Sequence, residues 1–217
     1  MGRSIQGFPV VEKAAFLQSH YPDQPDGSEQ RSAKRYSLLI RPAKLVSSQG
    51  EFVCVLRDVS RSGVSARLFH DLPRGDNFQL ELQNRHSYPI KRVWVREQEA
   101  GFEFEGEVNV DQLISEASEF PKRGLRLALE FPVTIITGTV RIEAMVKNIS
   151  QQGARIECRE LLAIDQNLRL ESASLRETRT KVRWRDGTEY GLVFDDTFSL
   201  RDFALLMARL QAPGLLA

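Results

Sequence analysis

Two arginines, Arg31 and Arg35, stand four positions apart in the segment Arg31-Ser32-Ala33-Lys34-Arg35, ahead of the first predicted strand. A guanidinium donates two parallel hydrogen bonds to a phosphate, and its flat face can stack on a nucleobase. In an extended or irregular segment, both side chains can reach one phosphodiester and one flat ring. The segment is therefore a candidate anion site, although a solvated basic stretch ahead of a strand would have the same sequence.

A second candidate is the pattern Asp58-x-Ser60-x-x-Gly63, at a predicted turn between two strands. A carboxylate and a hydroxyl two residues apart can project to one side and offer acceptors to a guanine edge. Gly63 permits a positive φ or a close approach of a ligand to the backbone. An Asx or Ser turn with a glycine bulge would give the same pattern. Its recurrence as Asn148-x-Ser150-x-x-Gly153 favours a functional interpretation.

Trp94 and the strand Gly101-Phe102-Glu103-Phe104 form a third set, for which packing is the favoured interpretation. A tryptophan in such a strand most often packs in the core or at the rim of a barrel. The sequence shows no catalytic constellation, because no serine stands in a nucleophile elbow and no glycine-rich phosphate loop precedes a helix. We therefore expect a protein that is not an enzyme.

The elements that must position these residues occur twice along the chain. The Asp58 and Asn148 motifs are separated by 90 positions, and the same offset relates four further pairs of identical residues. These pairs are Lys91 and Lys181, Trp94 and Trp184, Gly101 and Gly191, and Phe104 and Phe194. Five matches in one register indicate two tandem copies of one domain, at about residues 30–114 and 119–217.

Within each copy, apolar residues alternate with polar ones, which is typical of strands with one buried face. The alternating residues are Val64, Ala66 and Leu68; Phe78, Leu80 and Leu82; Phe102 and Phe104; Ala154, Ile156 and Cys158; Leu168 and Leu170; and Leu192 and Phe194. Turn-like clusters at 47–50, 73–77 and 186–187 separate about six short strands per copy. The fold class is therefore all-β, and each copy is a small closed barrel or a sandwich.

Short helices are predicted only at the ends of the copies. Leu200, Phe203, Met207 and Leu210 form an apolar stripe with helical spacing, and Ser199 with Asp202 would cap that helix. We expect the stripe to pack across the open end of its own barrel rather than to fill a partner's groove. A weaker helix is predicted over residues 111–118, and residues 1–29 are predicted to be a flexible N-terminal arm.

The composition limits the remaining possibilities. Of 217 residues, 41% are hydrophobic and 27% charged, which is typical of a soluble globular protein, and the net charge of +1 provides no general attraction to nucleic acids or anionic lipids. Cys54 and Cys158 make no metal-ligand spacing with the three scattered histidines, so we expect buried thiols and no metal site. No stretch is long and apolar enough to span a membrane. A cytoplasmic location, without nucleic-acid or membrane partners, is expected.

The set of motifs resembles the PilZ domain family of bacterial cyclic di-GMP receptors: Arg-x-x-x-Arg, Asp/Asn-x-Ser-x-x-Gly about twenty residues later, then Trp and Gly-x-x-Phe. The resemblance covers about 190 residues in two copies. It implies two tandem six-stranded antiparallel β-barrels and cyclic di-GMP as a ligand, with no cofactor. It further implies that Arg31 and Arg35 grip the phosphates and stack on the guanines, while Asp58 and Ser60 hydrogen-bond the ligand and Gly63 keeps the turn open.

The second copy departs from this pattern in its basic segment. Asn148, Ser150 and Gly153 fit, but the segment reads Lys122-Arg123-Gly124-Leu125-Arg126, so Lys122 replaces the first arginine when Arg126 is aligned with Arg35. Lysine keeps the charge but lacks the stacking plane and the planar fork. Arg123 is one position out of register. The second copy is thus a weaker site, and a structural or partner-binding role is favoured there.

The resulting functional prediction is a cyclic di-GMP receptor in which the first barrel is the sensor. Ligand binding would fold the arginine arm onto the barrel near Asp58 and relay the signal to a downstream protein by a change of shape. The alternative is a PilZ-like adaptor that acts through protein contacts without the ligand. A barrel for single-stranded nucleic acid is disfavoured, because most aromatic residues are predicted to be in the core.

Overall fold

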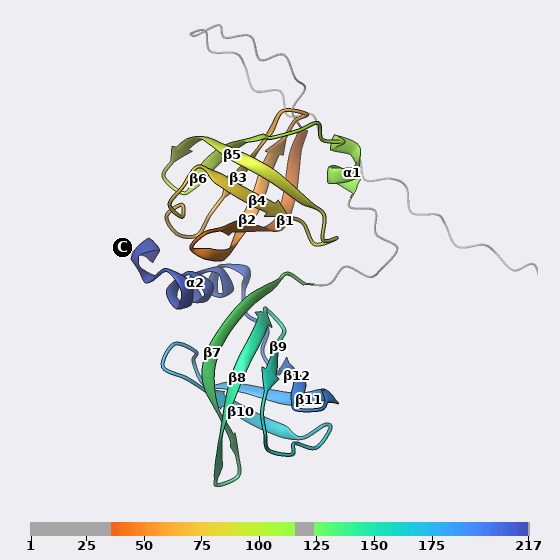
Figure 1. The fold of residues 1–217 in the computed structure, drawn as a ribbon, viewed down its shortest axis with the longest axis vertical. Helices are drawn as coiled ribbons and strands as arrows, with labels where there is room; N and C mark the ends of the chain where they lie inside the picture. Colours follow the sequence, from red (N-terminus) through yellow and green to blue (C-terminus); the bar gives the residue numbers. More distant parts are fainter. Residues whose placement is uncertain (1–35, 116–123, 217) are drawn as a thin grey trace, which may run out of the picture. The chain divides into compact units, whose positions relative to one another are not determined.

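The computed structural model describes residues 36–115 and 124–216, which form two closed antiparallel barrels of six strands each (Figure 1). The predicted arm at 1–29, Arg31, Arg35, Lys122 and Arg123 lie outside the described residues. The prediction of an all-β fold with two six-stranded barrels is confirmed. The sandwich that the alternation also allowed is not observed in the described residues.

Barrel 1 has the strand order β1-β2-β3-β6-β5-β4, closed by pairing of β1 with β4. Its strands are β1 (Tyr36–Ser47), β2 (Gly50–Val59), β3 (Gly63–Arg67), β4 (Asn77–Glu81), β5 (Ser87–Arg96) and β6 (Glu99–Phe104). The short helix α1 (Val110–Ser115) follows β6. Arg41 on β1 donates hydrogen bonds to the carbonyls of Leu113 and Ile114, which satisfies the C-terminal end of this helix.

Barrel 2 repeats this arrangement in the order β10-β11-β12-β9-β8-β7. Its strands are β7 (Arg126–Thr137), β8 (Val140–Ser150), β9 (Gly153–Glu157), β10 (Asn167–Glu171), β11 (Thr178–Asp186) and β12 (Glu189–Phe194). The helix α2 (Leu200–Gln211) and the short 3-10 helix η1 (Pro213–Leu216) end the described chain. The pairings keep the offset of 90, since Lys44 pairs with Val53 and Thr134 with Glu143.

The alternating residues of each copy fill the two barrel cores. Val64, Ala66 and Leu68 are at most 5% exposed, and their counterparts Ala154, Ile156 and Cys158 at most 7%. Both cysteines are buried and unpaired, as expected. Burial raises the pKa of the Cys54 thiol to about 12 and also raises the pKa of Cys158, because a thiolate would lose its hydration there.

The α2 helix begins as predicted. Ser199 is the N-cap and accepts the backbone N–H of Asp202 at 3.1 Å, while its hydroxyl donates to the Asp202 carboxylate at 2.7 Å. Phe203 and Met207 are fully buried in a core cluster that consists mostly of barrel 2 residues and also includes Val53 of β2 in barrel 1. The stripe thus packs on its own barrel as predicted, but not on that barrel alone.

A different set of α2 residues contacts barrel 1. Ala208, Ala212 and Leu215 form a buried cluster with Phe52 of β2. The Gln211 amide hydrogen-bonds both backbone groups of Glu51, accepting from its N–H at 2.8 Å and donating to its carbonyl at 2.7 Å. The C-terminal helix therefore packs against residues of both barrels.

Candidate functional site

Asp58, near the end of β2, is held in place by two serine hydroxyls. Ser37 Oγ donates to Asp58 Oδ1 at 2.8 Å, and Ser65 Oγ donates to Oδ2 at 3.2 Å while accepting the Asp58 N–H at 3.2 Å. The half-buried carboxylate is thus fixed from both sides. Each of its oxygens can accept about two hydrogen bonds, so the carboxylate can still accept hydrogen bonds from a ligand.

Ser60 and Gly63 close the turn between β2 and β3. The Ser60 N–H donates to the Gly63 carbonyl at 2.8 Å, and Ser60 Oγ accepts the Gly63 N–H at 3.2 Å. Because Ser60 is only 7% exposed and its hydroxyl serves the turn, its main observed role is structural. The structure thus brings Ser60 and Gly63 next to Asp58.

Gly63 is required by the packing of strands. A Cβ at this position would lie 2.4 Å from the carbonyl oxygen of Phe102 on β6, closer than real Cβ atoms come. Gly63 has no positive φ, so of the two alternatives that the sequence left open, the positive φ is not observed. The physical reason is that the neighbouring backbone, not a turn of unusual handedness, excludes a side chain here.

A pocket of about 280 Å³ opens beside Asp58 on the outside of barrel 1. Its walls come from the β2–β3 turn and from β5 and β6, and include Trp94, Gly101 and Glu103. The only charged groups among the lining residues are two carboxylates, those of Asp58 and Glu103. This set favours a flat ring that donates N–H groups, whereas a phosphate would need cations from another segment of the chain.

Trp94 lines this pocket, so of the two predicted packing positions, the core and the rim of the barrel, the core is excluded. Its side chain is 38% exposed, and its indole lies over Gly101, where a Cβ would be 2.0 Å from Nε1. The β5–β6 register shifts between Arg92 and Trp94, which interrupts the inward and outward alternation on which the prediction depended. The Arg96 guanidinium lies 5.8 Å from the ring centroid.

The sequence prediction missed Ser37, Ser65 and Glu103, which complete the surroundings of Asp58. Serines that face outward from strands carry no distinctive signal. The tryptophan did carry a signal, because Trp94 pairs with Gly101 across the sheet and Trp184 pairs with Gly191 in the second copy. A side chain that needs a glycine opposite it in both copies lies flat on the sheet.

The corresponding region of barrel 2 differs at the position facing the motif. Asn148 pairs with Arg155, where Asp58 has Ser65. Within the described residues, neither Asn148 Oδ1 nor Arg155 Nε has a hydrogen-bond partner, although both atoms are buried. Arg155 instead contacts Glu189, with Nη1 3.3 Å from Oε2. This asparagine therefore lacks the fixed, anionic setting of Asp58.

The other second-copy residues occupy the expected places on the sheet. Ser150 Oγ donates to the Gly153 carbonyl at 3.1 Å, and a Cβ on Gly153 would lie 2.1 Å from the Leu192 carbonyl oxygen, as for its counterpart Gly63. Arg126 is exposed and pairs with Ser150 at the start of β7. The structure thus brings Arg126, Asn148, Ser150 and Gly153 to one end of barrel 2.

Two other kinds of site are absent from the part of the chain that the structure describes. No group of three or more His, Cys, Asp or Glu side chains gathers there in a way that could hold a metal ion. Nor does that part contain a helix long and apolar enough to span a membrane.

Several solved structures are similar to this chain. They include Borreliella burgdorferi PlzA in complex with c-di-GMP, at 10% identity, with 83% of this chain and 94% of that chain covered and a TM-score of 0.32. Bacillus subtilis MotI/DgrA, an inhibitor of motility, is 15% identical, with 78% and 95% covered and a TM-score of 0.32. Escherichia coli YcgR in complex with c-di-GMP is 8% identical, with 76% and 80% covered and a TM-score of 0.29.

The family comparison covers both copies. No curated protein sequence matches the chain. The model of the PilZ domain matches twice, over residues 29–117 and 121–211, and thus includes both barrels and both basic segments. The chain therefore belongs to the PilZ domain family.

Proposed function

We propose that this protein is a cyclic di-GMP receptor and that barrel 1 is its sensor. The observation that carries the proposal is the Asp58 carboxylate, fixed by Ser37 and Ser65 beside a pocket whose wall is the exposed ring of Trp94. Two PilZ-type structures similar to the chain, PlzA and YcgR, are complexes with c-di-GMP. This likeness agrees with the chemistry of the pocket.

Cyclic di-GMP combines two phosphates with two guanines, and two segments of the chain would bind these two kinds of group. The guanine N1–H and N2–H groups are donors that suit the two acceptor oxygens of Asp58. The described pocket has no cation among its lining residues, so the phosphates need charge from elsewhere. Arg31 and Arg35, ahead of β1, would provide that charge and stack on the bases.

Chain connectivity supports the proposed role of the second arginine. Tyr36, the first residue of β1, pairs with Val59, and Ser37 pairs with Asp58. Arg35 directly precedes Tyr36 in the sequence, and this adjacency supports a role for its guanidinium in ligand binding near Asp58.

The same geometry explains how binding would be relayed. Ser37 at the start of β1 donates a hydrogen bond to the Asp58 carboxylate. A ligand that binds Asp58 would therefore change the strength of the contact that fixes this end of the strand. Ligand binding would order the arginine segment against the barrel and change the surface available to a downstream protein partner. Such a receptor needs no catalytic group.

Barrel 2 is proposed to be the weaker site. Its Asn148 is neutral and stands opposite Arg155, so a guanine would meet one amide oxygen in place of a carboxylate. Lys122, at the place of the first arginine, cannot stack or form a bidentate pair. Arg123 and Arg126 keep positive charge near this end of the barrel and would support weak binding of an anion.

Isothermal titration calorimetry with cyclic di-GMP tests both the proposal and the ranking of the barrels. Arg35→Ala should remove most of the binding, whereas its counterpart Arg126→Ala should have little effect. Likewise, Asp58→Ala should remove most of the binding, whereas Asn148→Ala should have little effect. Equal weakening by the members of each pair would refute the ranking, and the absence of binding by the unmodified protein would refute the proposed function.

A further inference from the structure

The surface of barrel 1 that receives the C-terminal helix provides a template for its duplicate. On β2, Phe52 is fully buried beneath Ala208, Ala212 and Leu215, and Gln211 hydrogen-bonds the backbone of Glu51. The β3–β4 loop adds a further contact, because the Asp71 N–H donates to the Leu215 carbonyl at 3.0 Å. One helical segment thus covers a hairpin and the neighbouring loop.

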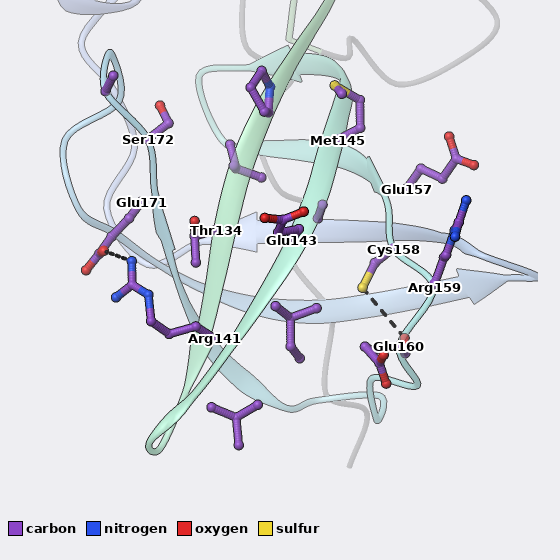
Figure 2. A pocket seen from close by; sticks show the side chains of 16 residues that line it. Thr134, Arg141, Glu143, Met145, Glu157, Cys158, Arg159, Glu160, Glu171 and Ser172 are labelled. Carbon is purple, nitrogen blue, oxygen red and sulfur yellow. Dashed lines mark hydrogen bonds and ion pairs between the residues drawn. The ribbon is translucent and has the colours of Figure 1, made fainter.

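The equivalent surface of barrel 2 is an open groove of about 1200 Å³, called here the barrel-2 groove (Figure 2). It is lined by residues 132–134 of β7, 140–145 of β8, 157–160 at the end of β9 and 171–173 at the end of β10. The offset of 90 places Ile142 at the position of Phe52 and Arg141 at that of Glu51. Ile142 is only half-buried, whereas Phe52 is fully buried.

Exposed aliphatic side chains lie at this same end of barrel 2. Val140, which lines the groove, is 54% exposed, and Leu161 and Ile164, in the loop after Glu160, are 70% and 53% exposed. That loop is joined to the β7–β8 hairpin, since Gln166 Nε2 donates to Thr137 Oγ1 at 3.1 Å.

Two of these residues, Val140 and Leu161, correspond to residues of barrel 1 that contact the C-terminal helical segment. The counterpart of Val140 is Gly50, whose missing Cβ would lie 2.2 Å from Gln211 Oε1, and the counterpart of Leu161 is Asp71, which bonds η1. Barrel 2 therefore carries exposed aliphatic residues at positions where barrel 1 meets a helical segment. Clustered apolar exposure of this kind marks interaction surfaces.

The lining residues of the groove carry four carboxylates and the two guanidiniums of Arg141 and Arg159, so they favour a partner of complementary charge over a helix with the neutral face of α2. Glu143 takes the place of buried Val53, and Glu160 that of His70. Arg141 is paired with Glu171 at 3.0 Å, and Glu157 with Lys147 at 3.1 Å. Glu143 and Glu160 form no ion pair with any described residue, and Figure 2 shows Glu143 near the middle of the view and Glu160 at its lower right.

We propose that the barrel-2 groove binds an amphipathic helix of another protein, with aliphatic residues facing Val140 and Leu161 and with Lys or Arg side chains facing Glu143 and Glu160. Opposite charges would fix the register and the choice of partner, and the aliphatic contacts would provide most of the affinity. A hollow surface requires a convex occupant, so two grooves facing each other would not fill this volume. The proposal is independent of nucleotide binding.

Two synthetic helical peptides test this on the full chain by fluorescence anisotropy. They share one aliphatic stripe, and one carries lysines where the other carries glutamates. The lysine peptide should bind, and Glu143→Lys with Glu160→Lys should weaken it roughly tenfold or more. Leu161→Asp should weaken it as well. The matched controls Asp186→Lys and Val193→Asp, exposed residues of barrel 2 outside the groove, should bind it as the unmodified protein does.

Several results would overturn the proposal. These are failure of the lysine peptide to bind, equal binding of the glutamate peptide, or binding that the groove variants leave unchanged. A dimer in sedimentation velocity that Leu161→Asp dissociates would assign the surface to a second copy of the chain instead. Repeating the titration with Asp58→Ala separates this test from the nucleotide proposal, because that variant should bind the peptide normally.

Discussion

Replacing Gly63 with alanine tests whether this glycine of the ligand motif is needed by the barrel itself. The new Cβ would lie 2.4 Å from the Phe102 carbonyl oxygen, whereas real Cβ atoms essentially never come within 3.0 Å. Since the Phe102 oxygen belongs to the backbone, β3 and β6 must move apart. The hydrogen bond from the Phe104 N–H to the Ser62 carbonyl, now 3.0 Å long, lies beside the clash and would weaken.

The expected loss follows from these two effects. Overpacking costs about 1–3 kcal/mol, and one weakened backbone hydrogen bond costs about 1 kcal/mol. We therefore expect Gly63→Ala to lower the free energy of unfolding of barrel 1 by roughly 2–4 kcal/mol. Gly153→Ala should affect barrel 2 similarly, because its Cβ would lie 2.1 Å from the Leu192 carbonyl oxygen.

Urea unfolding followed by tryptophan fluorescence measures this for each barrel separately, because the chain has two tryptophans and each barrel holds one. Trp184→Phe leaves Trp94 as the reporter of barrel 1. Gly106→Ala is the matched control, since a Cβ there would meet nothing within 4 Å and no positive φ is involved. If Gly63→Ala proved as harmless as Gly106→Ala, the argument that strand packing fixes this glycine would be refuted.

Three further predictions concern stability. Burial lowers the pKa of His70 from its usual 6.5, so the folded state binds fewer protons than the unfolded state. The free energy of unfolding should therefore fall as the pH drops below about 6.5. In urea unfolding at several pH values, His70→Gln should remove this pH dependence. Lys44 Nζ is buried 3.1 Å from Glu51 and 3.0 Å from Glu81, so Lys44→Ala should cost about 3–5 kcal/mol and Lys44→Met distinctly less, measured by urea unfolding. Ser199→Ala should cost about 1 kcal/mol by removing the α2 cap, and Ser199→Asp should restore most of it in thermal melts.

The structural cause of the His70 shift lies at the contact between barrel 1 and η1. Its ring packs 5.2 Å from that of Phe52, and Nδ1 donates to the Asp71 carbonyl at 2.7 Å. Nε2 is buried with no hydrogen-bond partner among the described residues. A second proton on Nε2 would therefore be unsolvated, which is why protonation disfavours the folded state.

The alternation of apolar residues was sufficient to predict two all-β copies, because a strand with one buried face repeats every two residues. It left a barrel and a sandwich open, and the six-stranded barrels were implied only by the resemblance to the PilZ family. Ser199 and Asp202 likewise predicted the beginning of α2. The contact of α2 with barrel 1 was not predictable, since Ala208 and Ala212 are small and Gln211 is polar. Such residues acquire a role only through a partner 160 positions away in the sequence, at Glu51.

The site was predicted in part for a similar reason. Asp58 stood out through a spaced motif that occurs twice, whereas Ser37 and Ser65 are ordinary serines whose contact with Asp58 depends on strand register. The alternation of Trp94 with charged residues in its strand left packing in the core and packing at the rim of the barrel both open. The register shift after Arg92 breaks that alternation and places the ring outside the barrel.

Fluorescence of Trp94 during titration with cyclic di-GMP tests the central claim most directly. In the Trp184→Phe protein, the one remaining indole lines the Asp58 pocket and is 38% exposed. We predict a saturable change in its emission that Asp58→Ala abolishes and Asn148→Ala preserves. An unchanged spectrum despite binding measured by calorimetry, or a change that Asp58→Ala leaves intact, would contradict the claim that the ligand binds at barrel 1.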